Sequence, residues 1–401
     1  MNWKKTFAII WTGQLFSILT STTINFAIII WLSIETGSAS VLALASVFAL
    51  LPQSVIGLFS GVIIDHVSKK KIMILADMFI ALCTLVLAAI FYLGDVSVWL
   101  IYLLLALRSV GSAFHAPALQ AAIPALAPED QLMRISGINQ SIYSVCNIAG
   151  PALGALLISM MDISFVLLFD VAGALIACGL LMFILIPDVK AGTKLNFYND
   201  IKEGLKVIAM NRGLLWLLFF SVIVVFFIMP ISALFPLMTL KHFNGDAFMM
   251  SIIEAAWGIG MLIAGTYLGI QKKQFNKVVM MNLANVILGF SFLLSGLLSR
   301  NLFVGFVALT IIGGISGVIF NSSFTVTLQT NIAPEFLGRV FSVYMSITII
   351  PSLLGLLGTG FAADLIGISN SFIIAGVVIA IIGIVAFMIP SVMKLEKSVT
   401  H

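Results

Sequence analysis

The sequence predicts an all-α membrane protein with twelve transmembrane helices arranged in two six-helix bundles. The chain is 61% hydrophobic and 9% charged, so it cannot cover its apolar surface with polar side chains in water. Basic residues return in every second gap between apolar segments. Short motifs of the first half also return in the second half at a nearly constant offset. These three observations indicate a duplicated, multi-pass membrane protein.

The apolar segments are long enough to span a bilayer. A spanning helix needs about 20 apolar residues, and with short loops the 401 residues accommodate twelve such helices. The first segment follows Lys4 and Lys5 as in a signal peptide, but it reaches Leu32 without a small-residue cleavage site, so we expect it to be retained. In chain order, the predicted spans are 7–33, 40–65, 72–93, 98–125, 135–160, 163–186, 213–240, 248–270, 278–299, 302–328, 338–363 and 370–392.

The positions of the lysines and arginines predict the orientation. All but three of the 20 lie at the amino terminus or in alternate gaps, and cytoplasmic loops collect basic residues. Both termini are therefore predicted to be cytoplasmic. The exceptions are Lys241 and Arg300 in the opposite gaps and Arg108 within an apolar segment. The net charge of +4 comes from the cytoplasmic loops, so it reflects the orientation of the chain and its contact with anionic membrane lipids. We therefore expect no nucleic-acid partner.

An internal repeat divides the chain into an N-terminal bundle (1–187), a cytoplasmic linker (188–212) and a C-terminal bundle (213–401). The repeat implies two bundles related by an axis along the membrane normal, with the substrate path between them. Its matches are Ala127-Pro128-Glu129 with Ala333-Pro334-Glu335, Arg134 with Arg339, Asp65 with Gln271, and Gly173 and Pro187 with Gly376 and Pro390.

A carboxylate precedes the tight basic loop after the second span. This stretch runs from Gly61 through Asp65 to Lys69 and Lys70. One interpretation is that the lysines only anchor the loop on the cytoplasmic side, with no further role. In the fifth span, Gly150 and Gly154 remove side chains from one helix face and Pro151 bends the helix. Ordinary small-residue packing is the alternative there.

These stretches resemble motifs A and C of the major facilitator superfamily. The resemblance implies a conformational latch centred on Asp65, and motif C is the signature of the exporter branches. His66 and Ser68 stand where the family usually has arginine and glycine, which implies a weaker charge relay. Other phrases are similar to macrolide-efflux proteins within the drug:proton antiporter type: Trp11-Thr12-Gly13-Gln14, Glu35-Thr36-Gly37-Ser38, Pro128-Glu129 and Ala233-Leu234-Phe235-Pro236.

The fourth span contains Arg108 and His115, in a stretch that resembles motif B of the same superfamily. A cation at mid-span costs about 2.5–3.5 kcal/mol to insert, so Arg108 should face a wet cavity or a partner. His115 follows seven residues later, on the same face and about 10 Å further along the helix. Both are proton-coupling candidates. Structural pairing of Arg108, and a hydrogen-bonded structural role for His115, are the alternatives.

Two carboxylates, Asp170 and Glu254, lie in the outer third of their spans. Apolar surroundings favour the protonated form of a carboxylate, so both are proton-coupling candidates. In the superfamily architecture the eighth helix borders the central cavity, which makes Glu254 the first candidate. The alternative for Asp170 is a structural hydrogen bond. Asp77 receives no transport role.

The predicted substrate-binding residues combine polar and apolar side chains. Such a lining suits bulky amphipathic molecules, often cationic, although packing or lipid contact is the alternative for each aromatic residue. The residues are Gln14, Asn25, Tyr143, Phe227, Met229, Trp257 and Asn321.

The motifs that are absent exclude several function classes. The sequence has no Walker A, GxSxG or HExxH motif, and Cys83, Cys146 and Cys178 lack metal-ligand spacing. We therefore expect no enzyme activity, no cofactor and no metal. Separately, we expect the protein to be a monomer. The resemblance implies drug export across a bacterial cytoplasmic membrane in exchange for protons. A lysolipid or glycolipid flippase, or a transport-dead sensor or scaffold, is the alternative.

Overall fold

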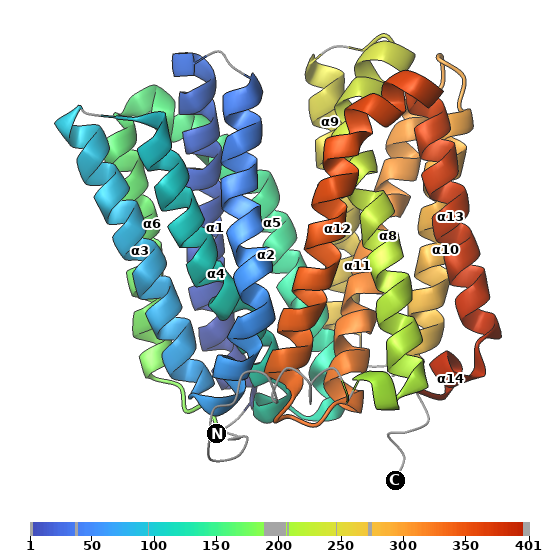
Figure 1. Cartoon of the computed structure of the whole chain (residues 1–401), viewed down its shortest axis with the longest axis horizontal. Coiled ribbons are helices and arrows are strands. Elements are labelled where there is room, and N and C mark those ends of the chain that lie inside the picture. Colours follow the sequence, from blue (N-terminus) through green and yellow to red (C-terminus); the bar gives the residue numbers. More distant parts are fainter. Residues whose placement is uncertain are drawn as a thin grey trace. The chain divides into compact units, whose positions relative to one another are not determined.

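The computed structural model describes residues 3–36, 39–94, 96–187, 206, 208–245, 247–271 and 275–395, and these residues form helices without strands (Figure 1). The membrane-length helices are α1 (Trp3–Thr36), α2 (Ala39–His66), α3 (Lys69–Leu93), α4 (Val98–Leu126), α5 (Leu132–Met160), α6 (Ile163–Met182), α8 (Arg212–Leu237), α9 (Ala247–Ile270), α10 (Lys277–Leu297), α11 (Phe303–Asn331), α12 (Leu337–Ile366) and α13 (Ile368–Met388). Shorter elements are η1 (Glu129–Gln131), the π-helical η2 (Met238–His242) and α14 (Pro390–Met393).

The predicted all-α, twelve-helix architecture is confirmed. Among the described residues, 11 helices are long and apolar enough to cross a membrane, and the count reaches 12 when the bent α2 is taken as one span. The bend in α2 separates Val47–Gly57 from Phe59–His66 by 58°. Most predicted spans agree with the helices within a few residues, because long apolar runs leave little choice of element.

Asparagine or aspartate side chains cap the N-termini of several helices. Asp162 accepts a hydrogen bond from the Ser164 backbone at 2.8 Å and so caps α6. Asn211 does the same for α8 through the amides of Gly213 and Leu214. These side chains satisfy N–H groups that have no partner within the helix.

The chain forms two compact units. Unit 1 comprises Met1–Ala127, Val145–Gly204 and Pro334–Ser346; unit 2 comprises Pro128–Ser144, Leu205–Ala333 and Ile347–His401. Two helices are therefore divided, because the first part of α5 belongs to unit 2 and the first part of α12 to unit 1. Most of the predicted linker 188–212 lies outside the described residues.

The helices follow the same neighbour order in each unit. In unit 1, α6 packs against α1 and α3, while α4 packs against α3 and α2. In unit 2, α13 packs against α8 and α10, while α11 packs against α10 and α9. The helices of unit 2 therefore pack in the same order as those of unit 1, with α8, α9, α10, α11 and α13 in the places of α1, α2, α3, α4 and α6, as the sequence repeat predicts.

Each unit has its own apolar core. In unit 1, α1, α3, α4 and α6 bury Ile24, Leu87, Ile101 and Val166, each at most 1% exposed. In unit 2, the centre is aromatic: Phe235 lies 5.3 Å from Phe372 and 5.6 Å from Phe306, measured between ring centroids. The ring of Phe372 meets Phe235 edge-to-face and that of Phe306 is stacked on it, and both arrangements add to the dispersion contacts of the core.

Candidate transport site and latch

Asp65, at the end of α2, caps the start of α12 within unit 1. Its two carboxylate oxygens accept hydrogen bonds from the backbone amides of Gly338 at 3.0 Å and Arg339 at 3.2 Å. The Nε of Arg339 lies 3.1 Å from the same carboxylate. Asp65 is 1% exposed, and the helix terminus and the guanidinium offset part of the cost of burying its carboxylate.

Gly61 makes this approach of α2 and α12 possible. A Cβ atom at position 61 would lie 2.5 Å from the Arg339 Cα and 2.7 Å from the Gly338 carbonyl oxygen. Both are backbone atoms, which cannot move aside as a side chain can. The hydroxyl of Ser60, the residue before Gly61, lies 3.1 Å from that of Ser342, one turn after Gly338 and Arg339 on α12.

The two predicted latch lysines have different surroundings. Lys69 is buried, at 3% exposure, and lies close enough to Asp65 to add to the positive potential there. Lys70 instead donates hydrogen bonds to the carbonyls of Met182 at 2.9 Å and Ile184 at 2.7 Å. It therefore satisfies the C-terminal carbonyl groups of α6.

The glycines of the fifth span bring α5 against α1 within unit 1. A Cβ at Gly150 would lie 2.8 Å from the Thr22 Cβ, and one at Gly154 would lie 2.7 Å from the Thr23 carbonyl oxygen. Pro151 lies in the same helix and is half-buried. The small residues remove steric obstruction at this crossing, as the sequence pattern predicts.

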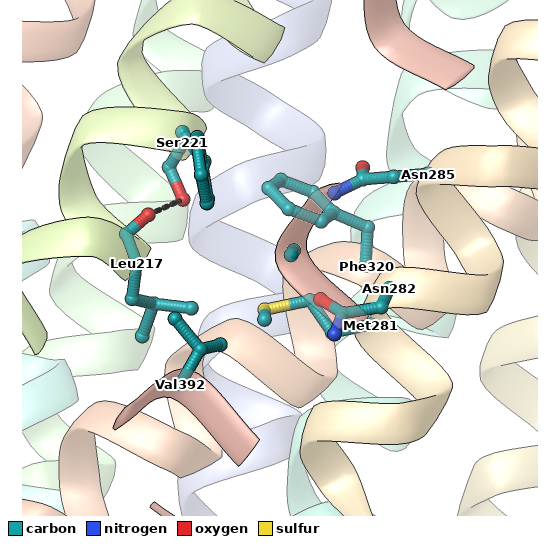
Figure 2. A pocket seen from close by; sticks show the side chains of 9 residues that line it. Leu217, Ser221, Met281, Asn282, Asn285, Phe320 and Val392 are labelled. Atoms are coloured by element: carbon teal, nitrogen blue, oxygen red, sulfur yellow. Dashed lines mark hydrogen bonds between the residues drawn. The ribbon is translucent and has the colours of Figure 1, made fainter. Parts of the chain in front are cut away.

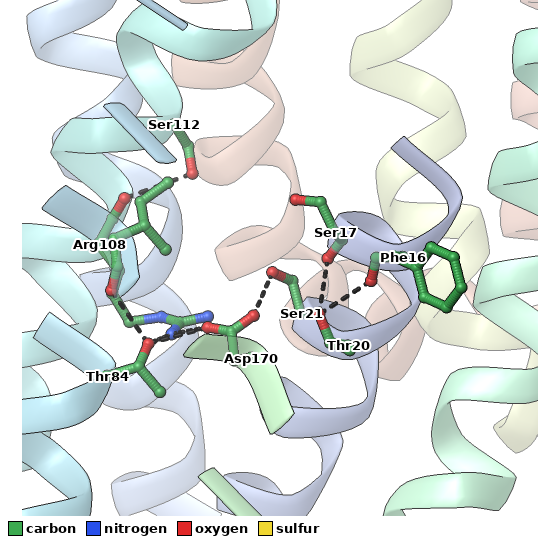
Figure 3. Close-up of polar contacts among 9 residues, drawn as sticks. Phe16, Ser17, Thr20, Ser21, Thr84, Arg108, Ser112 and Asp170 are labelled. Atoms are coloured by element: carbon green, nitrogen blue, oxygen red, sulfur yellow. Dashed lines mark hydrogen bonds and ion pairs between the residues drawn. The ribbon is translucent and has the colours of Figure 1, made fainter. Parts of the chain in front are cut away.

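Arg108 forms a buried ion pair with Asp170 (Figure 3). Arg108 Nη1 lies 2.5 Å from Asp170 Oδ2, and the two residues are 6% and 2% exposed. Thr84 donates to the same carboxylate at 2.8 Å and Ser21 donates to its other oxygen at 2.7 Å. Arg108 also contacts the Thr84 hydroxyl. Side chains from α1, α3, α4 and α6 thus converge on one carboxylate.

His115 has a buried acid beside it. Its Nε2 lies 3.4 Å from Asp77 Oδ1, and the side chains are 14% and 5% exposed. His115 is on α4 and Asp77 on α3, so this pair joins the same helices as the Arg108–Thr84 contact. No spacing or motif in the sequence connects Asp77 with His115. Whether Arg108, His115 and Asp170 take part in proton coupling stays a prediction.

Glu254 differs from the other membrane carboxylates. Its residue is exposed on α9, and among the described side chains no cation pairs with it. Asp65, Asp77 and Asp170 each have a basic partner. An ionisable group at this depth without a counter-ion is a functional-site candidate.

The predicted polar substrate residues have varied surroundings. In unit 1, Gln14 is buried and Asn25 is exposed. In unit 2, Tyr143 is 40% exposed, and the exposed Asn321 accepts a hydrogen bond from Gln140 Nε2 at 2.8 Å. Gln140 on α5 was not among the predicted residues, although its amide lies on a helix already singled out for polar groups.

The predicted apolar substrate residues all belong to unit 2. Trp257 packs into the aromatic core, with its ring centroid 6.0 Å from that of Phe235. Phe227 makes an edge contact with Phe226 at 5.4 Å, and Met229 is half-buried. Trp257 therefore has a packing role in addition to any contact with substrate.

A small cavity lies within unit 2 (Figure 2). It has room for about one water molecule, ≈ 10 Å³. Asn282 and Asn285, which line it, are at most 3% exposed, and their Oδ1 atoms have no hydrogen-bond partner within the described part of the chain. This cavity is far too small for a drug-sized molecule. Its other lining residues are Leu217, Phe220, Ser221, Met281, Phe320, Ala386 and Val392.

Comparison with known proteins agrees with this architecture. Residues 3–399 match the family described as transmembrane secretion effectors. The chain is 38% identical over 400 residues to macrolide efflux protein A of Streptococcus pyogenes, and the aligned region covers 98% of each chain. It is 25% identical to the multidrug efflux pump Tap of Mycolicibacterium fortuitum, over 91% of each chain.

Solved structures show the same fold at low identity. The fucose:proton symporter FucP of E. coli superimposes with a TM-score of 0.78, at 16% identity, covering 97% of this chain and 99% of that one. These relatives are transporters of the major facilitator superfamily and not enzymes. The family match over residues 3–399 and the 38% identity over nearly the whole of both chains assign this chain to the transmembrane secretion effector family of the major facilitator superfamily.

Proposed function

We propose that the protein exports amphipathic drugs of the macrolide type from bacterial cells in exchange for protons. The observation that carries this proposal is the 38% identity to a macrolide efflux protein over nearly the whole of both chains. In this proposal both termini are cytoplasmic, as the distribution of basic residues predicts. The Asp65 contact would then lie at the cytoplasmic end of the helices.

Alternating access supplies the mechanism. Drug would enter from the cytoplasm or the inner leaflet, and protons would enter from outside. If both bind the same region, each displaces the other, which gives exchange instead of co-import. The contacts between Asp65 and the start of α12 would favour the outward-facing state, because they hold α2 and α12 together at the cytoplasmic end.

Glu254 is the proposed proton carrier. It is an exposed carboxylate on a membrane helix, and no basic side chain described by the structure neutralises it. A carboxylate that is already ion-paired, such as Asp170, would have to break a strong contact to accept a proton. Glu254 can change its protonation state without that loss.

The test is drug export by proteoliposomes with an imposed proton gradient. We expect an uncoupler to stop uphill export, and Glu254→Gln to reduce it at least about tenfold. Glu35→Gln is the matched control, because Glu35 is an exposed acid near the end of α1, and it should keep full activity.

Two outcomes would contradict the proposal. Uphill export by Glu254→Gln would remove Glu254 from the coupling mechanism, and export that continues with the uncoupler would remove proton exchange. Lysolipid or glycolipid transfer between leaflets without drug export would favour the flippase alternative.

A further inference from the structure

The sequence repeat places a second, altered copy of the Asp65 latch in unit 2. Gln271 lies 206 residues after Asp65, and Arg134 lies 205 residues before Arg339. The pair formed by Asp65 on α2 and Arg339 on α12 therefore corresponds to Gln271 after α9 and Arg134 on α5. All of these residues lie at the helix ends predicted to be cytoplasmic.

The helices of the second copy also cross closely. A Cβ at Gly137 of α5 would lie 2.8 Å from the Gly265 carbonyl oxygen of α9, and the Ser144 hydroxyl donates to the Gly258 carbonyl at 2.7 Å. Towards the cytoplasmic end, a Cβ at Gly269 would lie 2.9 Å from the Ile138 side chain. The two helices run antiparallel at this crossing. Gln271 follows Gly269 by two residues, and Arg134 precedes Ile138 by one turn. Gln271 and Arg134 therefore come to the same level along the two helices.

The chemistry of the two copies differs. Asp65 supplies a carboxylate to two amides and a guanidinium, whereas Gln271 is neutral and cannot form an ion pair. The start of α5 is instead preceded by the short helix η1, in which the Gln131 amide donates to Pro128 at 3.0 Å. The Nε atoms of Arg134 and Arg339 are both buried without a hydrogen bond of good geometry, but the Arg339 Nε lies 3.1 Å from the Asp65 carboxylate, whereas no carboxylate in the described part of the chain forms an ion pair with Arg134. A buried donor without an acceptor is unfavourable.

We propose that Arg134 and Gln271 form an incomplete second latch, and that the neutral side chain at position 271 keeps the cytoplasmic side able to open. One complete latch favours closure of that side. A second carboxylate would add a charge-assisted contact to every closed molecule and would shift the equilibrium further towards closure. The proposal rests on the proposed function for the orientation of the helices and for alternating access.

The test replaces Gln271 with its isosteric acid and measures how often the cytoplasmic side opens. Ser342→Cys, a buried position beside Ser60, reports opening through labelling by a membrane-impermeant maleimide in inside-out vesicles. The natural cysteines Cys83, Cys146 and Cys178 are first changed to alanine. We expect Gln271→Glu to slow labelling about tenfold, whereas the neutral control Gln271→Met should show no such slowing.

Arginine variants show whether the effect passes through Arg134. In an Arg134→Gln background, Gln271→Glu should have no effect. Arg134→Gln alone should leave labelling almost unchanged, whereas Arg339→Gln should speed it about tenfold. Slowing that persists without Arg134, no slowing at all, or equal acceleration by the two arginine variants would overturn the proposal.

The arginine comparison decides the question even if Gln271→Glu does not insert. The assay needs neither drug nor gradient, so a failure of the proposed transport function would be seen separately, in the proteoliposome experiment.

Discussion

Buried charges in unit 1 are compensated residue by residue. Asp170 receives Arg108, Thr84 and Ser21, which fill both of its oxygens with donors. In a low-dielectric interior, removing one member of an ion pair leaves the other charge without compensation, and this is worse than removing both. The stability of the bundle should therefore depend on the pair and not on either charge alone.

We predict that Arg108→Gln destabilises the protein by about 3–5 kcal/mol, because it strands the Asp170 carboxylate. The double variant Arg108→Gln/Asp170→Asn should lose clearly less than the sum of the single losses. Thermal unfolding in detergent measures both. Ser112→Ala is the control, since its hydroxyl only contacts the Arg108 backbone carbonyl at 3.3 Å. Strict additivity would show that the two charges are not coupled.

Asp162 gives a pH-dependent prediction outside the membrane spans. Hydrogen bonds from the Ser164 hydroxyl and then the Ser164 amide lower the pKa of Asp162 below 3.8. When the pKa of a carboxyl group is lower in the folded state, the group stabilises the protein at pH above its pKa in the unfolded state. This stabilisation is lost as the pH falls through its pKa in the folded state. Asp162→Ala should cost about 1 kcal/mol near neutral pH, and this cost should shrink as Asp162 is protonated at low pH, because the charge-dependent part of the capping is then lost.

Thermal unfolding as a function of pH checks the Asp162 prediction. Ser97→Ala is the control, because Ser97 precedes α4 without a side-chain capping bond. A destabilisation by Asp162→Ala that is the same at every pH would show that the carboxylate charge does not contribute.

The sequence identified most of these ionisable residues but not their partners. Hydropathy placed Arg108 inside a span, and the cost of inserting a cation predicted that it needs a cavity or a partner. The partner is Asp170, 62 residues away on another helix. The pattern of residues within one helix does not show which other helices are its neighbours. The His115–Asp77 contact could not be predicted for the same reason.

At the scale of helices, close crossings depend on single glycines. We predict that Gly61→Ala prevents the approach of α2 to α12, because its Cβ would overlap backbone atoms of Gly338 and Arg339. Export should fall at least about tenfold if the latch is needed for alternating access. Drug export normalised to membrane expression is the measurement.

Gly179 on α6 supplies the matched control for Gly61. A Cβ there would meet nothing within 4 Å, so Gly179→Ala should export drug normally. Full export by Gly61→Ala would show that this crossing is not needed in its observed form.

Helix positions were predictable, but the direction in which each side chain faces was less so. Long apolar runs fixed the spans, since only a helix satisfies backbone groups in lipid. Trp257 is predicted to contact substrate, and its ring also packs with Phe235 and Phe292; the substrate contact stays a prediction. An aromatic ring suits a cavity face and a packed face equally well, so its identity alone does not distinguish the two.

At the scale of the whole molecule, each half of the chain supplies a segment to both compact units. Pro128–Ser144 belongs to unit 2, although the first half encodes it, and Pro334–Ser346 belongs to unit 1. We predict that two fragments divided within the linker will not be stable when expressed separately. Co-expressed fragments should co-purify and restore export. Stable, separately folded halves would contradict this prediction.

The same exchange of segments constrains how such transporters can recombine. A chimaera that joins the first half of this chain to the second half of a distant relative would combine Asp65 and Gly61 with a foreign α12, and Gly137 with a foreign α9. Functional hybrids should therefore arise only between parents that match at these two crossings, whatever their overall similarity.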